Sequence, residues 1–201
     1  GHGPILEEDI ALTNIALDFV GNATSLLTYA GQVENKGRNE DDLAFMRGER
    51  EFRNLLITEQ PNGDYAATIA RQFLFDTYMF FLYEELKNSK DETIAAIGVK
   101  SHKEVTYHLR HTSEWMLRLG DGTIESHERL QNGLNDLWMF TSEMFEMDEV
   151  DALLIKEGIV PDLNKVKASW EKRVHEVLAE ATLQIPTTTF KQKGRLFYIL
   201  L

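Results

Sequence analysis

The chain has 201 residues, of which 43% are hydrophobic and 10% aromatic, and this is enough apolar material for one domain with a sizeable core. It contains no cysteine, which excludes disulfides, thiolate metal sites and cysteine nucleophiles. The formal net charge of -12 argues against nucleic acid and anionic membranes as partners, because both favour clustered Lys and Arg.

The N-terminal part of the chain predicts two helices. The first is expected from Ile5 to about Ala30, because one side of it repeats at three- and four-residue steps. That side carries Ala11, Ile15, Asp18, Asn22, Leu26 and Tyr29. A polar loop over residues 32–39 follows, and Asn39 is a suitable N-cap for a second helix that reaches roughly to Thr58.

The middle of the chain predicts two long helices. Pro61 and the Asn-Gly pair after it end the second helix, and Asp64 can cap a third that runs to about Asn88. Ser89 or Asp91 starts a fourth helix. It ends at residues 119–122, where glycine permits a left-handed cap.

The C-terminal part predicts two more helices separated by an acidic turn or short helix over residues 148–156. Thr123 with Ser126 opens the fifth helix, which is expected to reach about Glu146. Pro161 and Asp162 introduce the last one, from Leu163 to Ala181. No alternating strand pattern competes with these helices, so we expect an all-α antiparallel bundle that forms a single domain over residues 1–201, with residues 185–201 as an irregular tail.

The location of the protein is also an expectation from the sequence. No signal peptide opens the chain, and no apolar run in it is long enough to cross a membrane. We therefore expect a cytoplasmic protein.

Ionisable residues on the apolar faces are the most informative feature of the sequence. Asp18 lies on the seam of the first helix and Asp76 on that of the third, while Glu104 and His108 share a face of the fourth. A buried carboxylate needs a partner or takes up a proton, because its desolvation is costly. Each of these acids therefore requires a base, a hydrogen-bond network or a metal.

A dinuclear metal site is the sharpest hypothesis for these residues. Helical bundles hold two metal ions with four carboxylates and two histidines, two helices each supplying Glu-x-x-His. That motif does not occur in the chain, and the inward groups amount to three carboxylates and one histidine. The competing interpretation pairs Glu104 with His108, and pairs Asp18 and Asp76 with inward groups such as Arg71 or Asn14. His102 and His111 are expected to be solvated or interfacial. The aromatic residues near Phe80 are expected to form core or an interface with another chain in preference to a ligand pocket.

Four segments of the sequence resemble one known family. They are GHGPILEEDIALTNIALDFVGNA, DDLAFMRGEREFRNLLITEQPNGDYAATIARQFLFD, KEVTYHLRHTSEWMLRLGDGT and DEVDALLIKEGIV. They are similar to the PaaC subunits of bacterial phenylacetyl-CoA epoxidase, the ring-1,2-phenylacetyl-CoA oxygenase. The resemblance spans about residues 1–186 and implies a ferritin-like helical bundle with additional helices.

The resemblance also implies a function. The sister subunit PaaA carries the di-iron centre, and the PaaC subunit is its non-catalytic structural partner in a heteromeric, NADPH-dependent monooxygenase of aerobic phenylacetate catabolism. The Glu-x-x-His positions of PaaA then fall on Thr77 with Phe80 and on Val105 with His108, so that one ligand of four survives. On this view Asp18, Asp76, Glu104 and His108 form a vestigial polar layer without metal.

We therefore expect a scaffold subunit with no catalytic residue and no cofactor of its own, bound to a PaaA-like subunit, with self-association as a second mode of assembly. The alternative is a di-iron or di-manganese carboxylate oxidase in its own right, and a third possibility is an all-α binding module. The resemblance also implies that the family's N-terminal helix is absent from this chain, which would leave an apolar stripe on the first helix uncovered, and that Arg195 to Leu201 form an exposed apolar run.

Overall fold

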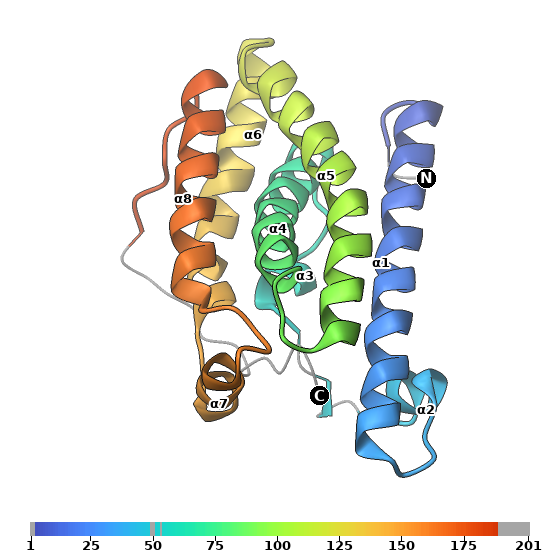
Figure 1. Ribbon diagram of the computed structural model, residues 1–201. Coiled ribbons are helices and arrows are strands. Elements are labelled where there is room, and N and C mark those ends of the chain that lie inside the picture. The colour runs from blue at the N-terminus through green and yellow to red at the C-terminus, as the bar shows by residue number, and fades with distance from the viewer. Residues whose placement is uncertain (1–2, 49–50, 53, 189–201) are drawn as a thin grey trace.

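A computed structural model describes residues 3–48, 51–52 and 54–188 of the chain (Figure 1). All regular elements in these residues are helical, as the sequence predicted. In chain order they are α1 (Leu6–Glu34), α2 (Glu40–Phe45), α3 (Leu56–Glu59), α4 (Tyr65–Leu86), α5 (Glu92–Gly120), α6 (Ile124–Leu137), the 3₁₀ turns η2 (Trp138–Phe140) and η3 (Ser142–Phe145), α7 (Glu149–Glu157) and α8 (Leu163–Glu180).

Local capping explains where most of these helices begin. The side chains of Asn39 and Thr123 accept hydrogen bonds from the backbone three residues on, and each forms a reciprocal capping box. Asp64 and Asp91 cap α4 and α5 by accepting from the backbone three residues on, and Asp162 caps α8 by accepting from the backbone two residues on. The expected helix starts are therefore confirmed.

Two expected helix ends are wrong, each for a physical reason. The helix that Asn39 caps stops at Phe45 and not near Thr58, and Gly48, a poor helix former, follows three residues later. The helix that Thr123 opens stops at Leu137 and not at Glu146. The tighter 3₁₀ turns η2 and η3 follow it and turn aromatic side chains toward α8.

The turn after α5 also differs from the expected left-handed cap. The C-cap is Asp121 with φ -98°, and neither Gly120 nor Gly122 has a positive φ. Gly120 is instead required by packing, because a Cβ there would overlap the carbonyl oxygen of Ala181 at the end of α8.

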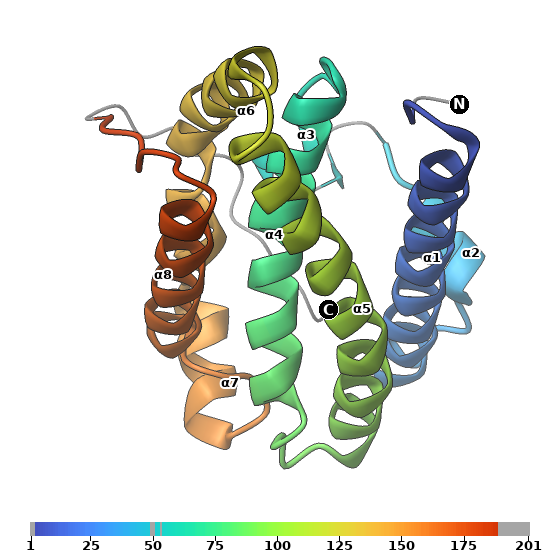
Figure 2. The same ribbon diagram turned by 90° about the horizontal axis from the view of Figure 1, so that it is seen from above.

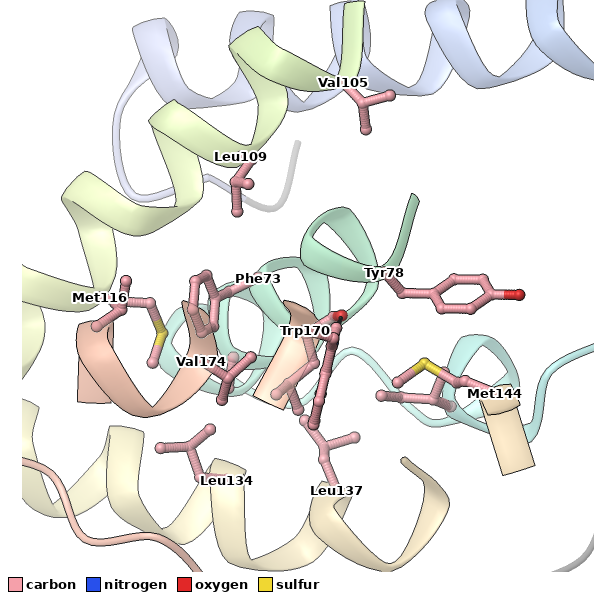
Figure 3. Packing of buried hydrophobic residues seen from close by; sticks show 14 of the residues in the cluster. Phe73, Tyr78, Val105, Leu109, Met116, Leu134, Leu137, Met144, Trp170 and Val174 are labelled. Carbon is pink, nitrogen blue, oxygen red and sulfur yellow. Dashed lines mark hydrogen bonds between the residues drawn. The ribbon is translucent and has the colours of Figure 1, made fainter. Parts of the chain in front are cut away.

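The hydrophobic core lies between α4, α5, α6 and α8. Helix α4 contacts each of the other three. Figure 3 shows Phe73 of α4 facing Met116, Leu134 and Val174, which come from α5, α6 and α8. Trp170 of α8 is anchored by a hydrogen bond from its indole Nε1 to the Leu74 carbonyl at 2.9 Å. These four helices form the packed bundle that carries the remaining elements.

Helix α1 lies outside this core, against α5 (Figure 2). The expected face, with Ile15 and Asn22, is turned inward and buried. Four side chains on the opposite face recur at helical steps and are exposed: Leu6, Ile10, Leu17 and Val20. The predicted apolar run at Arg195 to Leu201 lies outside the described residues.

By length and composition alone, α1 could cross a membrane, which sequence reasoning did not expect. Length and apolar composition are weak support for a membrane span. Core helices of soluble proteins and signal sequences near an N-terminus have both properties too.

Candidate functional site

Helix α5 organises the inward polar residues because it lies between α4 and α1 (Figure 2). It presents side chains to both neighbours. The four residues expected to form one polar layer do not meet at a single point in the structure. They divide into a pair between α1 and α5, a hydrogen-bonded carboxyl of α4 that contacts α5, and a separate carboxylate on α5.

Asp18 of α1 and His108 of α5 form the first of these contacts. His108 Nε2 lies 2.8 Å from Asp18 Oδ2. The His108 side chain is only 1% exposed and its ring lies 5.2 Å from that of Phe19, centroid to centroid, whereas Asp18 remains 40% exposed. The pair therefore fixes the position of α1 along α5 at a point where the histidine is shielded from water.

Asp76 of α4 is fully buried and is held by two hydrogen bonds. Gln72 Nε2 donates to Asp76 Oδ1 at 2.6 Å, and Thr112 Oγ1 of α5 donates to Asp76 Oδ2 at 3.2 Å. Burial raises the pKa of the Asp76 carboxyl from 3.8 to about 8, although both hydrogen bonds act in the opposite direction. At neutral pH this carboxyl is therefore mainly protonated.

Glu104 does not pair with His108, which corrects the sequence expectation for these two residues. The structure describes no hydrogen bond between them, and His108 is paired with Asp18 instead. The Glu104 side chain is 26% exposed, and its Oε1 lies 3.9 Å from Lys100 Nζ. A four-residue step placed both groups on α5 correctly, but the side chains turn to different surroundings.

Arg71 and Asn14 are not the partners of the inward acids. The Arg71 guanidinium binds the Gln60 carbonyl and the Asn62 side chain at the turn before α4. Asn14 is exposed on α1. Periodicity identified the face of each acid but not the residue opposite it.

A further polar contact joins the N-terminal end of α1 to the bundle. Glu8 Oε2 accepts a hydrogen bond from Tyr65 OH of α4 at 2.8 Å and lies 2.8 Å from His111 Nε2 of α5. Of the two environments expected for His111, solvated or interfacial, the solvated one is wrong, because the side chain is 14% exposed and lies between α5 and α1. Sequence reasoning missed Glu8, although its seven-residue step to the inward Ile15 was a usable signal.

Two more contacts continue this series toward the other end of α1. Ser101 Oγ donates to Asn22 Oδ1 at 2.7 Å, and Tyr29 OH donates to Asp91 Oδ2 at 2.5 Å. In these four contacts the residue number on α1 rises while the residue number of its partner at α5 falls, so the two helices are antiparallel. Helix α1 is thus joined to α5 by a series of specific polar pairs, and apolar side chains of α1 such as Ile15, Phe19 and Leu26 are buried or partly buried beside them.

The geometry of these residues does not fit a dinuclear metal centre. Within the described part of the chain, no three His, Asp or Glu side chains converge in a way that could hold a metal ion. The positions that the family resemblance equates with ligands have other roles. Thr77 Oγ1 donates to the Phe73 carbonyl at 2.7 Å, Val105 is fully buried, and the Phe80 ring packs 4.7 Å from that of His102.

What the arrangement can do chemically is therefore limited. Its polar groups are used to join helices, and no nucleophile with an adjacent base is formed by Asp18, Asp76, Glu104 or His108. Buried polar pairs of this kind specify which residues of two helices lie side by side. The residues support a structural interpretation of the layer.

Two comparisons with known proteins bear on these observations. The family model described as phenylacetic acid catabolic protein matches residues 1–196. The chain is also 47% identical over 186 residues to a protein of Escherichia coli (strain K12), the C subunit of 1,2-phenylacetyl-CoA epoxidase. That alignment covers 92% of this chain and 75% of the relative.

Proposed function

Because the chain belongs to the phenylacetic acid catabolic protein family, with an all-α ferritin-like fold, we propose that it is the non-catalytic structural subunit of a multicomponent phenylacetyl-CoA monooxygenase (ring epoxidase) in aerobic phenylacetate catabolism. In this proposal the chain binds and supports a PaaA-like subunit that carries the di-iron centre. It holds no cofactor itself and works in the cytoplasm. The relative is named as one subunit of an epoxidase, which supports assembly with other subunits.

The state of the inward acids is the observation that carries this proposal. Asp18 is paired with His108. Asp76 accepts hydrogen bonds from Gln72 and Thr112. A dinuclear site needs four carboxylates and two histidines that converge from four helices. A chain that retains the bundle while its polar groups serve contacts between helices is suited to support a catalytic neighbour.

The exposed side of α1 is a candidate binding surface for a partner subunit. Leu6, Ile10, Leu17 and Val20 lie on one face of α1, with the exposed Thr13 between Ile10 and Leu17, and these four residues are defined here as the α1 stripe. Exposed apolar side chains gathered on one face are typical of sites where another protein binds. We assign the α1 stripe to the PaaA-like subunit, and a second copy of this chain is the competing occupant.

Co-purification with a PaaA-like subunit tests the proposal. The two chains are co-expressed with an affinity tag on the PaaA-like chain only, and the complex is analysed by size exclusion and light scattering. We expect both chains in one stable heteromeric peak. Recovery of this chain only as a free monomer or as an assembly with itself would contradict the proposal.

A matched pair of variants then tests the α1 stripe. Leu17→Lys introduces a charge within the stripe at a side chain that is 62% exposed, and Val33→Lys introduces the same charge at a 53% exposed position outside it. We expect Leu17→Lys to lower the yield of complex while Val33→Lys leaves it unchanged. Equal yields would remove the assignment of the partner to this face without affecting the wider proposal.

A further inference from the structure

A mainly apolar cavity of about 290 Å³, open to solvent on one side, lies where α1 faces α4 and the segment of residues 54–58. Helix α1 supplies Phe19, Ala23 and Leu26, and α4 supplies Phe75, Tyr78 and Tyr83 among others. The rings of Phe19 and Phe75 are 5.5 Å apart at a tilt of 58°. The cavity is separate from the contact between Asp76 and Thr112, which lies on the α5 side of α4.

Its size is that of a small-molecule site and not of a packing defect. Core voids in well-packed proteins rarely exceed a water molecule, whereas an apolar cavity of about 150 Å³ already binds benzene. Ligand pockets begin at roughly 300 Å³ and are lined mainly by apolar and aromatic side chains with a few polar groups. The cavity matches this description in volume and in lining.

One polar group in the lining lacks a partner. Asn22 is 2% exposed, and its Oδ1 accepts the hydrogen bond from Ser101. This bond commits one end of the amide to α5. In the part of the chain that the structure describes, Asn22 Nδ2 is buried and has no hydrogen-bond partner. A buried donor without a partner costs free energy, which an acceptor placed in the cavity would recover.

The charge of the lining limits which acceptor fits. Its described residues include no Lys, Arg or His, so a carboxylate would be placed against apolar side chains without a counter-ion from this lining. A neutral carbonyl oxygen meets the requirement of the Asn22 amide without this cost. The aromatic rings in the lining favour a flat, apolar body on the same molecule.

We propose that this cavity binds a small, neutral aromatic molecule whose single carbonyl oxygen accepts a hydrogen bond from Asn22 Nδ2. The ring of the ligand lies among Phe19, Phe75 and Tyr83. This site is independent of the role of the chain as a subunit, and a ligand bound there joins α1 to α4.

Three probes of similar size test the proposal on the unmodified protein. Acetophenone carries the carbonyl, ethylbenzene has nearly the same shape without it, and benzoate carries a charge. Binding is followed by nuclear magnetic resonance, including the signal of the Asn22 side-chain amide. We expect saturable binding of acetophenone with a shift of that signal, affinity about tenfold weaker for ethylbenzene, and no saturable binding of benzoate.

Variants on α1 locate the site. Ala23→Phe places a ring at an exposed position within the lining and should weaken acetophenone binding, whereas Ala16→Phe, at an exposed position of α1 outside the lining, should retain it. Asn22→Leu removes the donor and should remove the preference for acetophenone over ethylbenzene. Should that variant fail to fold, the comparison of the two probes on the unmodified protein still decides. Absence of saturable binding, as expected of a cavity that holds only water, or equal affinities for the two probes, would overturn the proposal.

Discussion

Asp76→Asn is expected to stabilise the protein by an amount that grows with pH. In the folded chain the pKa of the Asp76 carboxyl is raised by burial to about 8, against 3.8 for an unperturbed carboxyl. Between these values the native state keeps a proton that the unfolded state releases, so rising pH lowers the free energy of unfolding. The contribution of the protonated Asp76 to the free energy of unfolding is fully present below pH 3.8 and is lost as pH rises through 8.

The size of the effect follows from the two pKa values. Keeping the carboxyl protonated in the native state costs about 2 kcal/mol at pH 5 and about 4 kcal/mol at pH 7, at about 1.4 kcal/mol per unit of pH above 3.8. An amide at this position is neutral in both states and has the same shape. It can still accept from Thr112 and contact Gln72. The advantage of the variant should therefore more than double over this range.

Urea unfolding of both proteins at pH 5, 6 and 7 measures this difference. Asp136→Asn, which removes a carboxylate from an exposed position of α6, is the control and should change stability by less than about 0.5 kcal/mol throughout. A constant gap between Asp76→Asn and the unmodified protein would refute the assignment of a buried, protonated carboxyl. A gap that shrinks as pH rises would indicate that the charged form is stabilised, as expected of a metal ligand.

Three further substitutions test other parts of the structure. Gly120→Ala should destabilise the protein by about 1–3 kcal/mol because its Cβ would overlap the Ala181 carbonyl, whereas Gly21→Ala, in open space on α1, should stabilise it by about 0.5–1 kcal/mol; thermal unfolding of the pair would count against this packing if both changes had the same sign. His108→Ala removes a buried ring and its bond to α1, and should cost about 2–4 kcal/mol in urea unfolding; a loss below about 0.5 kcal/mol would contradict a structural role. Glu104→Gln should alter melting temperature or complex yield while turnover per assembled oxygenase stays near that of the unmodified protein, and a large loss of turnover with assembly intact would argue for a catalytic role.

Capping residues were the most predictable feature of the fold. Asn39, Asp64, Thr123 and Asp162 act on backbone groups two or three residues away, so their effect is contained in the local sequence. The end of α6 was not predictable in this way. The 3₁₀ turns after it depend on contacts of Trp138 and Phe145 with the distant α8, which no local pattern reports.

The candidate site shows the same division. Helical periodicity placed Asp18 and His108 on inward faces, and both are in contact with the bundle. It could not show that these two residues, 90 positions apart, pair with each other while Glu104 stays separate. The side chain opposite a given residue depends on how far one helix is displaced along its neighbour, and a single sequence contains no direct measure of that displacement.

Metal content tests the central claim most directly. The isolated chain, expressed with iron and manganese supplied and purified without chelators, is analysed by inductively coupled plasma mass spectrometry, together with its complex with the PaaA-like subunit. We predict far less than one iron or manganese ion per chain in the isolated protein, and iron in proportion to the PaaA-like subunit in the complex. Close to two ions per isolated chain would contradict a structural role and support an oxidase in its own right.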